Sequence, residues 1–252
     1  MKPSTKIIAL AVAVLLAVPL AVVAAPPAKG GAPYEVKGSN FHIIGDHGNN
    51  MQYDGGLIFE NEGSAIIEVD PVSNSGKIVT EWVDPRDSVA SLVGKTAPVN
   101  VRIVATKFMP PDHPSGVLSD GRNTQTIDGD SIAINHFEHG STGIGAPIVT
   151  NLFTHLATWG PVEVYIDGQF FGTLMLHTML TAGVRDEATD QVLNADKTGF
   201  YSPMAPDDGF VDMEETQLHV IIRTGEPDSS NFPPFSIFWH LMFYDVKVEI
   251  RG

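Results

Sequence analysis

The sequence predicts a mainly β protein, an antiparallel β-sandwich of jelly-roll or Ig-like type with few short helices. Two observations predict it: many short apolar runs are separated by turn residues, and helix signals are scarce. The chain has 252 residues, of which 43% are hydrophobic, and this is enough for a sizeable core. Cysteine is absent, so disulfides and thiolate metal sites are excluded.

The N-terminus has the pattern of a cleaved secretory signal peptide. Lys2 and Lys6 precede the apolar run 7–23, which ends in small residues. Val22 and Ala24 fit the positions before a signal peptidase cut, so we expect residues 1–24 to be removed and the protein to be secreted or periplasmic. No other stretch is apolar enough to span a bilayer, so we expect no membrane contact after cleavage.

Two further parts follow the signal peptide. Pro, Gly and Ala predict a flexible leader over residues 25–38, and residues 39–252 are expected to form the sandwich domain. Within it, the apolar runs predict strands over 56–60, 64–69, 77–83, 99–108, 131–137, 161–166, 169–181, 217–224 and 236–250.

Two of these strands carry the clearest patterns. The run 161–166 alternates between apolar and polar residues, and Asp167-Gly168 predicts a tight hairpin turn after it. In the last run, Trp239, Leu241 and Phe243 share one face while His240 and its alternate neighbours share the other. A long strand that is apolar on both sides suits the middle of a sandwich.

Helix signals are confined to three places. Asp84-Pro85 predicts a helix start, with Gly94 as the stop. The segment 149–159 fits a helix or a strand, and 188–193 fits a short helical turn.

The net charge of the chain restricts the classes of partner that it is expected to bind. The formal net charge is −15, and loss of Lys2 and Lys6 makes it about −17. Such a field repels phosphate backbones, so nucleic acid is not an expected partner, and it attracts cations. Protein partners cannot be deduced from these residues.

A short row of methionine and histidine is the most suggestive chemical motif. On a strand, Met175, His177 and Met179 lie on one face, and His240 and Met242 occur close together on another strand. Thioethers with imidazole suit Cu(I), and imidazole also suits Cu(II) and zinc. These pieces resemble the Met/His clusters of periplasmic copper chaperones over some ten residues, although that family's longer spacing is not met after His177.

Three histidines on separate strands extend this idea. His219 lies in a third apolar run, so His177, His219 and His240 are candidates for one open metal site inside the sandwich. Their convergence depends on strand register, which the sequence does not fix.

A second candidate site lies at His136-Phe137-Glu138-His139. His136 and Glu138 share a strand face, and with His139 they offer metal ligands, but Gly140 rules out the helix that metalloprotease motifs need. Acidic loops at 128–130 and 207–215 offer oxygen ligands without the EF-hand order, so calcium ranks behind copper and zinc.

Three functions remain open at this point. The leading hypothesis is an exported, non-enzymatic sandwich that binds copper, zinc or a small ligand. The first alternative is a metal-dependent enzyme, with Glu138 as general base beside His136 and His139. The second is a structural or adhesive cell-envelope module, whose signature is an exposed apolar patch without a polar pocket.

Overall fold

The computed structural model describes residues 33–46, 57–111, 131–138, 152–194, 197–201, 215–231 and 233–251. The expected signal peptide lies outside these ranges, as do most of the leader, His139, and all but Glu215 of the two acidic loops. Among the helical segments described, none is long and apolar enough to cross a membrane.

Nine strands and one short helix make up the described chain. They are β1 (Tyr34–Ile44), β2 (Ile58–Asp70), β3 (Ser75–Asp84), α1 (Asp87–Ser91), β4 (Val99–Ala105), β5 (Ile132–Glu138), β6 (Leu152–Ile166), β7 (Gln169–Ala182), β8 (Thr216–Arg223) and β9 (Phe238–Ile250).

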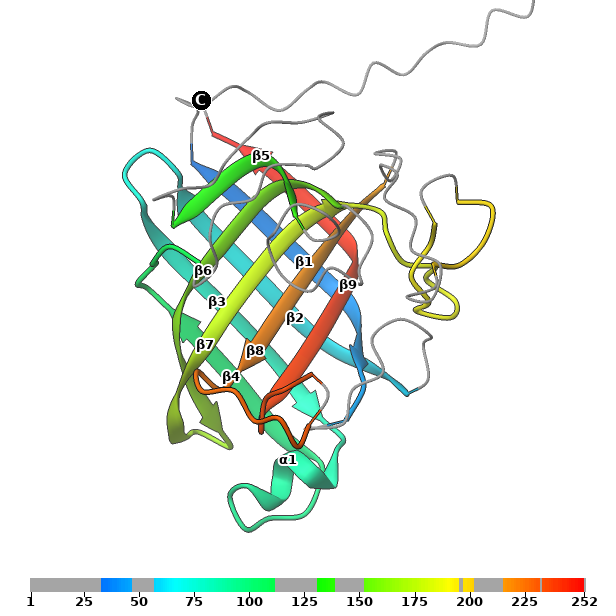
Figure 1. Cartoon of the computed structure of the whole chain (residues 1–252). Coiled ribbons are helices and arrows are strands. Elements are labelled where there is room, and N and C mark those ends of the chain that lie inside the picture. Colours follow the sequence, from blue (N-terminus) through cyan, green and yellow to red (C-terminus); the bar gives the residue numbers. More distant parts are fainter. Residues whose placement is uncertain are drawn as a thin grey trace, which may run out of the picture.

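The strands form one sheet that closes into an antiparallel barrel of eight strands (Figure 1). The strand order is β4-β3-β2-β1-β9-β8-β7-β6-β5, and a further pairing of β4 with β6 closes the ring. β5 pairs with the first half of β6 and β4 with its last residues, so β4 and β5 share one position beside β6. Figure 1 shows α1 at the end of the barrel away from β5.

The expected mainly β, antiparallel architecture is confirmed. The strands form one closed sheet, however, and not the two packed sheets of the expected sandwich. Alternation of apolar and polar residues fixes which face of a strand is buried, and it is the same in a sandwich and a barrel. The difference lies in the pairing of β9 with β1 and of β4 with β6, which joins strands far apart in the chain.

Side chains from all eight strands of the ring fill the barrel interior as a single core cluster. Phe41 of β1 stacks on Phe243 of β9 with ring centroids 4.6 Å apart, and Trp82 meets Trp239 edge to face at 6.2 Å. Such packed aromatic pairs stabilise a core beyond their buried area.

A buried ion pair lies among the core residues. Asp84 accepts hydrogen bonds from Arg86 Nη2 at 2.7 Å, Arg86 Nε at 3.0 Å and Trp82 Nε1 at 2.9 Å. The guanidinium also lies 5.9 Å from the Trp239 ring centroid and donates to the Gly45 carbonyl oxygen. Asp84, expected to cap a helix, is therefore committed to this ion pair, and α1 begins only at Asp87.

The Asp167-Gly168 hairpin between β6 and β7 is confirmed. Both residues have positive φ, 48° and 76°, as a type I′ turn requires. Asp167 also binds β4, because its carboxylate accepts from the Asn100 amide at 2.7 Å. The turn thus fastens the same edge at which β4 meets β6.

Other boundaries differ from the sequence-based expectation. β1 begins at Tyr34, inside the range expected to be a flexible leader, and its first three residues are buried. The segment 152–159, which fits a helix or a strand, belongs to β6. Residues 188–193 form no helix and are held instead by isolated bridges such as Arg185–Val192.

Candidate functional site

The histidines of the barrel follow a pattern that connects neighbouring strands. One lies on each of six strands: His42 (β1), His136 (β5), His155 (β6), His177 (β7), His219 (β8) and His240 (β9). Paired residues in a ladder point to the same side, so core membership of their neighbours assigns their faces. Five of them lie opposite the core residues, whereas His155 falls at a register shift in β6 and has no ladder partner in the described strands. We call this outward side of β5 to β9 and β1 the histidine face.

One cross-strand row on this face combines methionine and histidine. Met179 pairs with His219, His219 pairs with Met242, and Met242 pairs with His42. Directly paired residues in antiparallel strands have Cβ atoms about 4.5–5.5 Å apart, within side-chain contact. His219 is therefore flanked by a thioether on each side.

His219 also contacts His240 on the next strand. Its Nδ1 lies 3.0 Å from His240 Nε2, and the two rings stack with centroids 5.3 Å apart. The other nitrogen of His219 lies 3.3 Å from the Thr181 hydroxyl oxygen. Both imidazoles are buried, as are Met179 and Met242.

A second cluster joins two histidines through one carboxylate. Glu138 lies between His136, whose Nε2 is 2.6 Å from Oε1, and His177, whose Nε2 is 3.2 Å from Oε2. The Glu138 side chain has no solvent exposure, and that of His177 retains 17%. The cluster is thus almost closed to water.

His177 lies between two hydrogen-bond acceptors. Its Nδ1 lies 3.2 Å from the Thr158 carbonyl oxygen, and its Nε2 faces the Glu138 carboxylate, so both partners are acceptors. The His177 ring stacks on Trp159, with ring centroids 5.0 Å apart.

Glu138 responds to these neighbours. Burial raises the pKa of its carboxyl, but the charges and hydrogen bonds of His177 and His136 outweigh burial and hold it well below the ordinary value. Glu138 is therefore a buried carboxylate.

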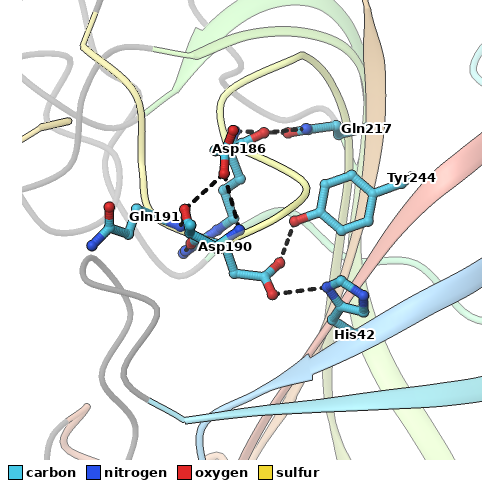
Figure 2. Close-up of polar contacts among 8 residues, drawn as sticks. His42, Asp186, Asp190, Gln191, Gln217 and Tyr244 are labelled. Carbon is cyan, nitrogen blue, oxygen red and sulfur yellow. Dashed lines mark hydrogen bonds and ion pairs between the residues drawn. The ribbon is translucent and has the colours of Figure 1, made fainter. Parts of the chain in front are cut away.

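A third cluster connects the barrel to the segment after β7 (Figure 2). Asp190, whose side chain is fully buried, accepts a hydrogen bond from His42 Nδ1 at 2.8 Å and another from the Tyr244 hydroxyl. Asp190 has a positive φ of 54°, an unfavourable conformation for a residue with a side chain. The Arg185 guanidinium holds it there by donating to the Asp190 carbonyl oxygen at 2.5 Å.

The carboxylate of Asp190 raises the pKa of both of its hydrogen-bond partners. Its hydrogen bond raises the pKa of His42 against the opposing effect of burial, and the charges of Glu60 and Glu187 add to the rise. Burial, followed by the Asp190 hydrogen bond, raises the pKa of Tyr244. Hence Nδ1 of His42 carries its proton, and Nε2 is the nitrogen left for another partner.

The structure separates the residues proposed from sequence into groups. His177 lies with His136 and Glu138, whereas His219 lies with His240, because Ile221 stands between His177 and His240 in their row. Within the described residues, no three side chains of His, Asp or Glu are arranged to hold a metal ion. Met179 lies beside His219, while the half-buried Met175 lies farther along β7, paired with Arg223.

Glu138, the general base of the first alternative function, is enclosed by two histidines. Both of its oxygens are hydrogen bonded to imidazoles, and its side chain has no solvent exposure. Sequence reasoning missed the cluster of His42, Asp190 and Tyr244, because these residues come from three distant segments.

Comparisons with known proteins give no further guide. No protein-family model matches the chain, and neither a curated protein nor a solved structure is significantly similar to it. What the described residues define is a class: an antiparallel eight-stranded barrel with a packed interior and a histidine-rich outer face.

Proposed function

We propose that the chain is an exported, non-enzymatic barrel that binds Cu(I) on the histidine face, through His219 and His240 with Met179 and Met242. The observation that carries this proposal is the placement of His219. It has a thioether in the ladder position on each side and an imidazole 3.0 Å from its Nδ1.

The chemistry of this donor set favours a soft ion. Thioethers bind Cu(I) well and harder divalent ions poorly. Zinc prefers four ligands of His, Cys, Asp or Glu, and the described residues offer no such group of even three. The two facing nitrogens of His219 and His240 share one proton, which Cu(I) would replace.

Export is part of the same proposal. The residues that carry the signal pattern lie outside the described ranges, so the pattern in the sequence is its support. The absence of cysteine agrees with a copper site built from methionine and histidine.

Anaerobic Cu(I) titration against a chromophoric chelator tests the site. We expect one equivalent of Cu(I) to bind, and His219→Ala to abolish binding. Met242→Leu conserves volume and should leave the fold intact, since such swaps usually cost less than about 1.5 kcal/mol. It should weaken Cu(I) binding at least ten-fold by removing one sulfur ligand.

His155→Ala is the matched control. His155 is another buried strand histidine, on β6, and β7 separates this strand from the strands of His219 and His240. Its replacement should leave the affinity for Cu(I) unchanged. The copper assignment is rejected if no stoichiometric binding occurs, or if Met242→Leu and His155→Ala alter the affinity equally.

A further inference from the structure

The four proposed copper donors are covered by the protein. His219 is 2% exposed, His240 3%, Met179 2% and Met242 0%. An ion in solution therefore cannot reach these side chains in the conformation described, and part of the chain must move before the site takes up or releases copper. Enzymes with enclosed sites use loops that move as lids in this way.

One described segment crosses the histidine face beside the donors. Residues 183–194, which we call the strap, follow directly after β7. At the base of the strap, the backbone amides of Val184 and Arg185 donate to the Gln217 side chain on β8, at 2.8 and 3.0 Å. Gln217 precedes His219 by two residues, which places the base about 7 Å along the strand from this copper donor.

The tip of the strap, residues 186–191, reaches two further strands. The Asp190 carboxylate accepts hydrogen bonds from the Tyr244 hydroxyl on β9 and from His42 Nδ1 on β1 (Figure 2). Tyr244 follows Met242 by two residues, and His42 is the ladder partner of Met242. The strap thus runs from β8 over β9 to β1 alongside the copper donors.

The base and the tip of the strap are held by different contacts. At the base, the Leu193 amide donates to the Val184 carbonyl oxygen at 2.8 Å, and Arg185 and Val192 form an isolated bridge. Val184 and Val192 also belong to a small apolar cluster with Leu152 of β6. This cluster fixes the base on the barrel, so the tip can lift while the base stays in place.

Asp190 has the properties of a latch at this tip. Its side chain is fully buried, and its backbone is held at a φ of 54°. Such a conformation persists where surrounding contacts enforce it, and Tyr244, His42 and the Arg185 guanidinium supply those contacts. Loss of the carboxylate contacts should therefore release the tip.

From these observations, we propose that the tip of the strap gates the copper site and that Asp190 is its latch. The inference rests on the proposed function, because it concerns how Cu(I) reaches His219 and His240. While Asp190 holds Tyr244 and His42, the tip is closed and Cu(I) neither enters nor leaves. The latch sets the rates of uptake and release, and the donors set the affinity.

Anaerobic stopped-flow mixing with a Cu(I)–acetonitrile complex measures uptake, and transfer to an excess of chelator measures release. Asp190→Asn keeps a residue type that tolerates positive φ but removes the charge, and Tyr244→Phe removes one hydrogen-bond donor. Each variant should raise both rates about ten-fold, the effect of losing one hydrogen bond to a charged group. The affinity should stay the same, because the donors are unchanged.

Glu187→Gln is the matched control. It removes the same formal charge from an exposed residue of the same tip and should leave both rates at the wild-type value. Thermal melts confirm that all three variants fold. Equal uptake rates in the control and both latch variants, or a loss of affinity without faster exchange of copper, would overturn the gate.

Hydrogen exchange of the copper-free protein examines the tip without any metal. The backbone amides of residues 186–191 should exchange faster in Asp190→Asn and Tyr244→Phe than in the wild type or Glu187→Gln. The gate is rejected alone if this exchange is unchanged, or if it is faster while the copper rates are not. A wild-type chain that binds no Cu(I) rejects the proposed function, and the gate with it.

Discussion

Replacement of Asp84 by alanine is expected to lower the free energy of unfolding by about 3–5 kcal/mol, because it leaves a buried arginine without its counter-ion. The Arg86 side chain is 1% exposed and that of Asp84 is fully buried. Asp84 also accepts hydrogen bonds from the Arg86 backbone amide at 3.0 Å and from the Trp82 indole, so its loss leaves donors on two residues without an acceptor. Urea denaturation measures the change.

A second variant separates charge from packing. If the cost of Asp84→Ala comes from an unpaired guanidinium, the double variant Asp84→Ala/Arg86→Met should be more stable than the single one, since no charge is left in the core. A double variant as unstable as the sum of its single changes would show instead that the lost contacts, and not the stranded charge, dominate.

The parts of the fold that sequence predicts are those set by neighbouring residues. Alternation over 236–250 correctly divides Trp239, Leu241 and Phe243 from His240, since the faces of a regular strand need only a period of two. The Asp167-Gly168 turn is equally local, because both residues tolerate positive φ.

The closure of the barrel cannot be predicted from patterns among neighbouring residues. β1 and β9, which pair from Tyr34 with Ile250 to Ile44 with His240, are the first and last strands described. The pattern within β1 also breaks at Asn40, where a φ of 50° accompanies a register shift between Ser39 and Phe41. A bulge of this kind hides a strand from a search for strict alternation.

The candidate sites show the same limit. His136 and Glu138 share a face as expected, but Ile134, two residues earlier, belongs to the core. Asn135, with a φ of 52°, lies where the strand changes faces. The pairing of His42 with Asp190 spans 148 residues and depends on a loop conformation, so no spacing rule reveals it.

The second large effect is expected at Glu138. Glu138→Gln should lower the free energy of unfolding at pH 7 by about 3–5 kcal/mol, because it removes the buried carboxylate to which His136 and His177 are both hydrogen bonded. A neutral amide also turns an N–H₂ group toward one of the two imidazole donors. Glu249→Gln, on an exposed residue, is the control and should have little effect.

The pH dependence of the stability lost in Glu138→Gln shows whether the charge of the carboxylate causes the loss. The pKa of Glu138 is held well below its ordinary value of 4.5, so the unfolded chain binds a proton at a pH where the folded chain does not. The carboxylate therefore contributes its full stability above the unfolded pKa, and this contribution declines as the pH falls toward the folded one. The gap between wild type and Glu138→Gln, measured by urea denaturation, should be widest near neutral pH and narrow steadily below about pH 5. A gap that stays constant down to strongly acidic pH would mean that Glu138 acts through shape rather than through its charge.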